Sequence, residues 1–260
     1  MTSWKVISRS EHNQTNWRRR QGYEFAADHQ VVEVLLAELS SVLPHYVLGF
    51  IKREDQYHLV AVLGFGGDRN YFAGPDNKWV CEVVPAALRA YPFRLITSSE
   101  AEEKVLCIDE GYLSEDSEDT PLFQEDGELD SSITGVLDFL NSCDHNRDLT
   151  QRACNSVAGA GIIEPWPLKI SAGVDEEEVT IEWLYRINET ALNSLSRTGL
   201  AELRSTSALP LAYAQLFSMN QLKGLVKRAE LISLQAARVE SNKSASSLFE
   251  DEGSLNFDLI

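Results

Sequence analysis

Residues 45–109 constrain the fold more than any other part of the chain, because short apolar runs alternate there with turn signals at close intervals. Residues 46–52 and 57–63 are two strand candidates, and the short polar segment between them suits a hairpin. Residues 93–97 and 104–109 also have strand character. Short strands joined by short turns favour antiparallel pairing. The sequence therefore predicts an antiparallel meander sheet over residues 45–109.

The middle of this region contains a turn signal and a helix signal. Residues 74–77 read Gly-Pro-Asp-Asn, which is typical of a turn, and we expect short strands at 70–73 and 78–83 on either side of it. Pro85 suits the first turn of a short helix that extends to Ala90. The predicted sheet thus contains one helical insertion.

Apolar residues with helical spacing flank the predicted sheet. Asp28 is a candidate N-cap for an amphipathic helix over residues 29–43. A long helix is predicted to begin at Ser132, a short one after Asn188, and a further helical stretch covers residues 207–239. Strands in one region and helices on both flanks predict an α+β fold.

The N-terminal arm, residues 1–27, is polar and mixed in character. Trp17, Tyr23 and Phe25 are candidates for packing this arm onto the core. Residues 18–20 are three consecutive arginines, which we interpret as an exposed turn or a contact with the protein's own acidic surface in preference to a partner site.

Charge is distributed unevenly along the chain, which has 23 Lys and Arg against 40 Asp and Glu and a net charge of -17. Residues 109–130 contain ten acidic residues and no basic residue, so we expect an acidic loop or a partly disordered segment, with residues 121–123 anchoring its middle. The net charge argues against nucleic-acid binding and against adhesion to an anionic membrane.

The compartment is predicted from what the sequence does not contain. There is no run of eighteen apolar residues, and the first twenty residues lack the apolar segment of a signal peptide. We therefore expect a cytoplasmic protein without membrane insertion. The four cysteines form no CxxC pair, and we expect free, mostly buried thiols.

Catalytic motifs do not stand out in this sequence. It has no GxSxG, GxxxxGK[ST] or HExxH pattern, and the glycines at 64–67 lack the spacing of a dinucleotide-binding loop, so we interpret them as a turn. His45, His58 and Asp109 would make a two-histidine, one-carboxylate iron site only if the fold brought them together, and structural histidines are the default interpretation. We expect no cofactor and no metal, and favour a non-catalytic protein.

Aromatic and arginine residues offer one ligand-binding hypothesis. A pocket between the sheet and residues 162–186 would combine aromatic walls with guanidinium groups, a pairing suited to a carboxylate or a peptide end. The candidate residues are Arg89, Tyr91, Trp166, Tyr185 and Arg186.

The last twenty residues form a separate unit in the prediction. We expect a single α+β domain over residues 1–240, followed by an acidic and aromatic flexible tail over residues 241–260. Apolar clusters set among acidic residues are suited to docking on a partner, although folding back onto the domain is an equally weighted alternative. The candidate partner-binding residues are Leu248, Phe249, Leu255, Phe257 and Leu259.

Nine blocks of the sequence, taken in order, carry a family resemblance: RRRQGYEFAADH, HYVLGFIKREDQYHLVAVLGF, NYFAGPDNKW, VVPAALRAYPFRL, VLCIDEG, PLFQEDGE, IIEPWPLKI, LYRINETALNSL and ALPLAYAQLFSMNQLKGL. On these blocks the chain resembles the bacterial SapC family over about residues 19–239, and the terminal LFEDEGSLNFDLI is similar to the ends of family members. The resemblance implies a neighbourhood of flavin-dependent halogenase-like proteins, cupin-like oxygenases and TonB-dependent receptors, and hence an accessory role. It implies no catalytic residues.

Our first hypothesis is a non-catalytic cytoplasmic accessory protein that binds a protein partner, such as a flavin-dependent halogenase-like or a cupin-like oxygenase enzyme. The alternative is a small-ligand or peptide-binding protein, or an enzyme, with a site near Trp166, Tyr185 and Arg186. A surface-layer-associated protein, which the family name implies, ranks third. The oligomeric state is left open.

Overall fold

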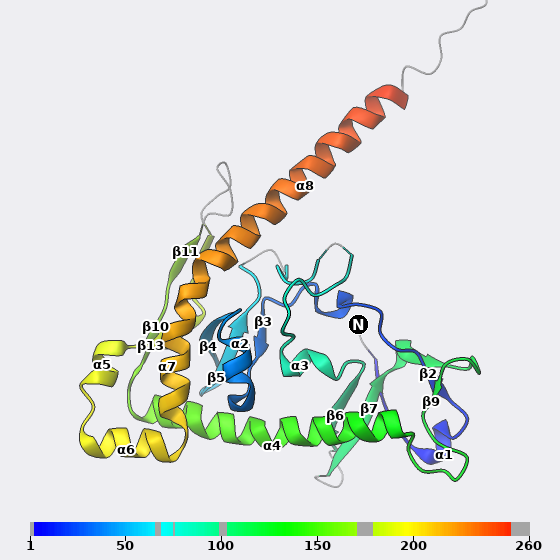
Figure 1. The fold of residues 1–260 in the computed structure, drawn as a ribbon, viewed down its shortest axis with the longest axis horizontal. Helices are drawn as coiled ribbons and strands as arrows, with labels where there is room; N and C mark the ends of the chain where they lie inside the picture. Colours follow the sequence, from blue (N-terminus) through cyan, green and yellow to red (C-terminus); the bar gives the residue numbers. More distant parts are fainter. Residues whose placement is uncertain (1–2, 66–68, 75, 99–102, 171–178, 251–260) are drawn as a thin grey trace, which may run out of the picture.

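The protein is represented by a computed structural model, which describes residues 3–65, 69–74, 76–98, 103–170 and 179–250 (Figure 1). Helices and antiparallel sheets together confirm the predicted α+β class. The α-helices are α1 Arg9–His12, α2 Leu39–Val42, α3 Ala86–Arg89, α4 Ser131–Gly159, α5 Glu189–Asn193, α6 Arg197–Ser205, α7 Ala208–Ser218 and α8 Leu222–Glu250. The short 3-10 helices are η1 Glu24–Ala26, η2 Leu36–Glu38, η3 Glu110–Tyr112 and η4 Met219–Gln221.

The strands form several separate sheets. In chain order they are β1 Trp4–Val6, β2 Asn16–Trp17, β3 Val31–Glu33, β4 Val47–Arg53, β5 Gln56–Val62, β6 Phe93–Thr97, β7 Lys104–Asp109, β8 Leu113–Ser114, β9 Thr120–Pro121, β10 Ile163–Pro165, β11 Leu168–Ile170, β12 Val179–Ile181 and β13 Leu184–Ile187. A five-stranded sheet has the order β10-β13-β4-β5-β3, two three-stranded sheets have the orders β1-β7-β6 and β8-β2-β9, and β11 pairs with β12.

The predicted hairpin is confirmed as β4 and β5, which pair from Val47 opposite Val62 to Arg53 opposite Gln56. The second predicted pair, β6 and β7, also forms an antiparallel hairpin. The two hairpins belong to different sheets, however, so residues 45–109 are not one continuous meander. The predicted strands at 70–73 and 78–83 are absent from the described residues there, which form only an isolated bridge between Ala73 and Trp79.

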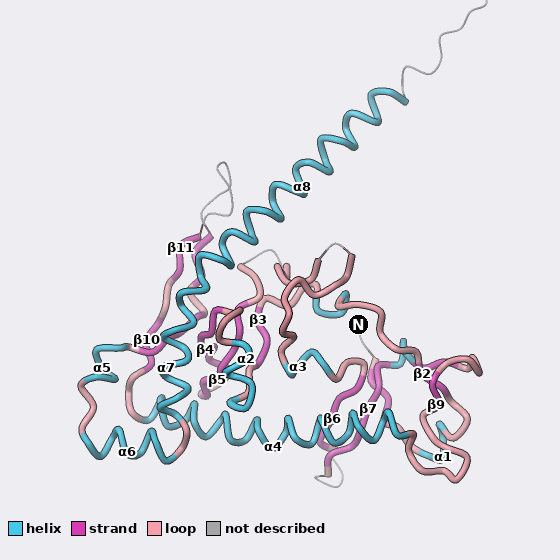
Figure 2. Tube along the Cα trace, in the orientation of Figure 1, coloured by secondary structure: helices cyan, strands magenta, loops and turns pink. Residues whose placement is uncertain are grey.

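The end of β5 packs closely against the chain that follows it. A Cβ atom at Gly64 would lie 1.9 Å from the carbonyl oxygen of Arg69, so the chain turns back on itself immediately after the strand. Besides β6, β7 pairs with β1, which belongs to the N-terminal arm. Figure 2 shows α3 and loops lying between the two groups of strands.

The predicted helix over residues 29–43 is wrong in its first half. Residues Val31–Glu33 form β3, which pairs with the free edge of β5, and η2 and α2 follow. The buried Glu38 carboxylate accepts hydrogen bonds from the backbone of Leu35 at 3.0 Å and of Ala86 at 2.7 Å. A long-range strand pairing therefore overrides the local helical spacing.

Helix α4 connects two hydrophobic cores and lies along both groups of strands (Figure 1). The predicted long helix is confirmed, with Asp130 as its N-cap in place of Ser132, since the Asp130 side chain accepts a hydrogen bond from the Ser132 backbone. Ile133 near its start is buried in the smaller core with Trp17, whereas Val157 near its end is buried in the larger core. One helix thus fixes the two halves of the molecule relative to each other.

The acidic run is mostly loop, as predicted, with a few short elements. It contains η3, β8 and β9, and the arm strand β2 lies between β8 and β9. Leu122 is fully buried, which confirms the predicted anchor. The arm is packed on the core as predicted, with Trp17 buried in the smaller core and Phe25 packed against the larger one.

The C-terminal part of the described chain is helical. The predicted stretch over residues 207–239 is divided into α7, η4 and α8, and α8 leaves the body of the molecule and projects away from it (Figure 1). Because α8 continues to Glu250, the first ten residues of the predicted flexible tail are helical, while residues 251–260 lie outside the described residues.

Two simple predictions can be compared with the structure directly. All four cysteines are free, and three of them are buried, as predicted. In the described part of the chain, none of the helices has the length and apolar character that a membrane-spanning segment requires.

Candidate functional site

The five predicted ligand-binding residues lie in two groups. Arg89 and Tyr91 line a cavity beside the N-terminal arm, and the other three are not among the residues around it. Trp166 is buried in the larger core, and Tyr185 packs edge-on against Tyr57 with ring centroids 5.1 Å apart. These three residues are in or next to the paired strands β10 and β13: Tyr185 and Arg186 are in β13, and Trp166 directly follows β10.

Arg186 has a structural partner. Its Nε lies 2.8 Å from Oε1 of Glu164, and the amide of Asn188 donates to the other carboxylate oxygen at 2.6 Å. This carboxylate therefore ties together two strands and the start of α5. It engages the Nε of Arg186, while 39% of the Arg186 side chain stays exposed.

The cavity beside the arm has a volume of about 650 Å³. We call it the arm cavity, and its lining comes from four separate segments: the arm, the loop after residue 76, the region from α3 to β6, and the first turns of α4. The charged and aromatic lining residues are Trp17, Arg19, Arg20, Tyr23, Lys78, Trp79, Arg89, Tyr91 and Phe93. Its volume lies within the usual range for small-molecule sites.

Backbone and aromatic contacts hold the arm against this cavity. The Tyr23 amide donates to the carbonyl oxygen of Asn77 at 2.8 Å, and the Tyr23 and Trp79 rings lie 5.2 Å apart. The Phe25 and Tyr91 rings stack with centroids 3.8 Å apart and an interplanar angle of 9°. Stacked and edge-on aromatic pairs stabilise such contacts beyond simple burial.

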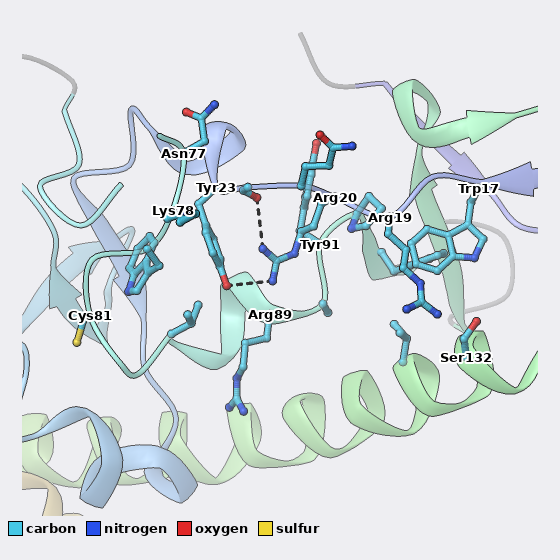
Figure 3. A pocket seen from close by; sticks show the side chains of 18 residues that line it. Trp17, Arg19, Arg20, Tyr23, Asn77, Lys78, Cys81, Arg89, Tyr91 and Ser132 are labelled. Atoms are coloured by element: carbon cyan, nitrogen blue, oxygen red, sulfur yellow. Dashed lines mark hydrogen bonds between the residues drawn. The ribbon is translucent and has the colours of Figure 1, made fainter. Parts of the chain in front are cut away.

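Arg20 is the most deeply placed cation of the arm triplet. Its Nη1 donates to the carbonyl oxygen of Gly22 at 3.3 Å and its Nη2 to the Tyr23 hydroxyl at 3.2 Å (Figure 3). The guanidinium carbon lies 4.2 Å from the Tyr23 ring centroid. Among the residues that the structure describes, no carboxylate comes within ion-pairing distance of Arg20, so its charge is held by neutral groups alone.

The other cations of the cavity are partly neutralised. Arg89 points toward α4 (Figure 3), where its guanidinium lies 5.0 Å from the Phe139 ring and 3.7 Å from the Glu38 carboxylate. Burial raises the pKa of Glu38, while its two backbone hydrogen bonds and Arg89 oppose that rise. Lys78 forms an ion pair with Asp76 at 3.2 Å, but 79% of its side chain is exposed, so solvent screens this pair.

Tyr91 is fixed by its hydroxyl group. That hydroxyl donates a hydrogen bond to the Asp109 carboxylate, and burial followed by the contact with Asp109 raises the pKa of Tyr91. The phenol is therefore neutral at physiological pH and acts as a wall of the cavity. Trp17, another wall residue, has a buried indole nitrogen with no hydrogen-bond partner in the described part of the chain.

The charged side chains that line the arm cavity are all basic. Its lining, as far as the described residues form it, contains four basic side chains and no aspartate, glutamate or histidine, the usual groups for general acid–base catalysis. His45, His58 and Asp109 are not gathered into a metal site, since the described residues contain no group of three or more potential metal ligands.

A second surface feature is the exposed side of α7 and α8. Leu231 and Leu234 on α8 are 50% and 67% exposed, and Phe217 on α7 is 60% exposed. Tyr213 packs on Phe217 with ring centroids 6.0 Å apart. The predicted tail residues Leu248 and Phe249 belong to α8, and Leu255, Phe257 and Leu259 lie outside the described residues.

Sequence reasoning missed most of the arm cavity. Of its charged and aromatic lining, it identified Arg89 and Tyr91 as ligand candidates and assigned the arginine triplet to the surface. The available signal was the proximity of three consecutive arginines to Trp17, Tyr23 and Phe25 in one short segment. That pattern is typical of aromatic surfaces that also hold guanidinium groups.

A family model described as SapC matches residues 7–225. Searches of curated proteins and of solved structures found no match. The matched region contains the whole lining of the arm cavity and ends just after α8 begins, so most of the projecting helix lies beyond it.

Proposed function

The chain belongs to the SapC family, and on this premise we propose that it is a non-catalytic accessory protein that binds a protein partner through α8. The observation that carries the proposal is the projection of α8 from the body with Leu231 and Leu234 exposed. Residues three apart share one face of a helix, so these two leucines form a single apolar contact.

The energetic argument concerns the exposed apolar area. Fully burying a leucine side chain contributes about 1.5–3 kcal/mol. Leu231 and Leu234 are 50% and 67% exposed, so burying the rest of both contributes about 2–3.5 kcal/mol to a complex. Helices commonly bind partners by laying such a face into an apolar groove. The tail residues Leu248, Phe249, Leu255, Phe257 and Leu259 extend this contact in the proposal.

The charge of α8 defines the partner's surface. Residues 222–238 contain four basic residues and one acidic residue, although the whole chain has a net charge of -17. A groove with an apolar floor and an acidic rim complements this helix. We place the complex in the cytoplasm with an enzyme of the flavin-dependent halogenase-like or cupin-like oxygenase type as partner, because the family resemblance implies such neighbours.

A ligand site at Trp166, Tyr185 and Arg186 has less support. Trp166 is buried in the core, and the Arg186 guanidinium is engaged by Glu164. Trp166 offers little surface to a ligand, and Glu164 already neutralises the charge of Arg186.

The test is capture of the partner from native lysate, with identification by mass spectrometry. Full-length protein is compared with a 1–240 truncation and with a Leu231→Glu, Leu234→Glu double variant. Leu200→Glu on α6 is the matched control, since Leu200 is an exposed helical leucine away from α8. We expect a stoichiometric partner that the double variant loses and the control retains. Equal capture by all four proteins would refute the role of α8.

A further inference from the structure

We propose that the arm cavity is a binding site for a small aryl carboxylate. In this assignment the Arg20 guanidinium pairs with the carboxylate, and the ring of the ligand lies among Tyr23, Trp79 and Tyr91. The site is built from the arm and the loops around α3, whereas the partner-binding role proposed above concerns α8. The two proposals therefore stand or fall independently.

The first argument is the sign of the charge in the cavity. The chain has almost twice as many acidic as basic residues, yet the described lining of the arm cavity has Arg19, Arg20, Lys78 and Arg89 and no carboxylate. A concave site lined by one sign of charge concentrates ligands of the opposite sign. Asp76 and Glu38 partly offset Lys78 and Arg89, so the excess positive charge of the lining rests on Arg19 and Arg20, and an anionic ligand suits it.

The second argument is the bonding capacity that Arg20 retains. A guanidinium has five N–H donors, and the two hydrogen bonds to Gly22 and Tyr23 use two of them. Its contact with the Tyr23 ring fixes the plane of the group. A planar, oriented guanidinium with free donors matches the two oxygens of a carboxylate.

The third argument is the aromatic character of the walls. Tyr23, Trp79 and Tyr91 all line the cavity and are all only partly buried, so each leaves part of its ring accessible. The stacked pair of Tyr91 and Phe25 makes one wall rigid. An aryl group on the ligand would stack or pack edge-on in such a space.

The charges around the cavity limit the ligand to one negative charge. Two adjoining hollows share Arg20 with the arm cavity, and one of them is lined by Glu38 and Glu82 while the other is lined by Glu118 and Asp119. A dianion such as phosphate would place a second negative charge toward these carboxylates. A monoanionic carboxylate avoids that repulsion.

The experiment is isothermal titration calorimetry on the full-length protein. The probes are benzoate and 2-naphthoate, with 2-naphthamide as a neutral ligand of the same shape and inorganic phosphate as a ligand without a ring. We expect saturable binding of the aryl carboxylates, at least about tenfold weaker binding of 2-naphthamide, and weaker binding of naphthoate at high salt.

The key variant is Arg20→Met, which removes the charge and keeps the length of the side chain. We expect it to weaken naphthoate binding by about tenfold or more. Arg204→Met is the matched control, because Arg204 is an exposed arginine on α6 and its replacement changes the net charge equally. Should Arg20→Met fail to fold, Arg19→Met serves instead, and it must weaken naphthoate while leaving naphthamide binding unchanged.

Three results would overturn the proposal: no saturable binding of either aryl carboxylate, unchanged naphthoate affinity in both cavity variants, or phosphate binding as tight as naphthoate. The 1–240 truncation must retain naphthoate binding whatever its effect on partner capture.

Discussion

Replacing Gln215 by leucine should destabilise the protein, because this buried side chain completes the junction between two strands. Its Oε1 accepts a hydrogen bond from the Ile187 amide at 2.8 Å, and its Nε2 donates to the carbonyl oxygen of Leu48 at 3.2 Å. Gln215 is fully buried on α7, so water cannot replace either bond. The amide of this glutamine bridges β4 and β13 beyond their direct pairing, which ends at Tyr185 opposite Phe50.

The magnitude follows from the groups left without partners. A buried donor or acceptor that loses its partner costs about 1–3 kcal/mol. Gln215→Leu leaves the Ile187 amide without this partner and the Leu48 carbonyl with only the 3.4 Å contact from Ser218 Oγ, so the two costs together are about 2–5 kcal/mol. The added apolar contact of leucine returns roughly 1 kcal/mol, so we expect a net loss of about 1–4 kcal/mol. Against a typical total of about 5–15 kcal/mol, this is a large change.

Urea unfolding followed by circular dichroism measures this loss as a lower midpoint at an unchanged slope. Gln235→Leu on the exposed side of α8 is the control, and we expect it to change the free energy of unfolding by less than about 0.5 kcal/mol. A loss below about 1 kcal/mol for Gln215→Leu would refute the bridging role.

Two further substitutions test the surroundings of the arm cavity. Burial raises the pKa of Glu38, so the folded state binds this proton more tightly than the unfolded state, whose Glu38 pKa is about 4.5. The free energy of unfolding should therefore fall as pH rises from about 4.5 through the raised pKa of the folded state. Glu38→Gln should make this fall smaller in urea titrations at several pH values, and an equal fall in the variant and the parent protein would contradict the argument. Gly22→Ala should cost about 1–3 kcal/mol, because its Cβ would lie 2.7 Å from Cβ of Asn77. The control is Gly135→Ala inside α4, where the added Cβ would have open space, and it should stabilise the protein by about 0.5–1 kcal/mol in thermal denaturation. The packing argument would be contradicted if Gly22→Ala proved the more stable of the two variants.

Local signals predicted the elements whose partners are close in sequence. The hairpin of β4 and β5, the hairpin of β6 and β7, and the long helix α4 follow from apolar periodicity and turn residues alone. Residues 29–43 were assigned to a helix because Val31, Leu35 and Leu39 have helical spacing. The pairing of residues 31–33 as a strand depends on the free edge of β5. The spacing of apolar residues within 29–43 carries no information about that edge.

The arm cavity could not be predicted for a related reason. Its walls come from residues 17–23, 77–84, 89–93 and 132–136. Only the second and third of these segments are close to each other in sequence. What joins them is the pairing of β1 with β7, more than a hundred residues away, and the packing of the arm on Asn77. Arg89 and Tyr91 were identified because they are close to each other in the chain.

The arm also explains how ten acidic residues without a basic neighbour in sequence are held against the rest of the molecule. The arm supplies hydrogen bonds to this run at several points: the Arg9 guanidinium donates to the carbonyl oxygen of Asp126 at 3.1 Å, the Asn16 amide to that of Asp116 at 2.5 Å, and the Arg18 backbone to that of Tyr112 at 2.9 Å.

The arginine triplet adds the charge that the acidic run lacks. Arg18, Arg19 and Arg20 share one hollow with Glu118 and Asp119, and Arg20 also lines the arm cavity. Positive charge within a Debye length of several carboxylates reduces their mutual repulsion. The same short segment therefore lies against the acidic run on one side and presents the Arg20 guanidinium to the arm cavity on the other.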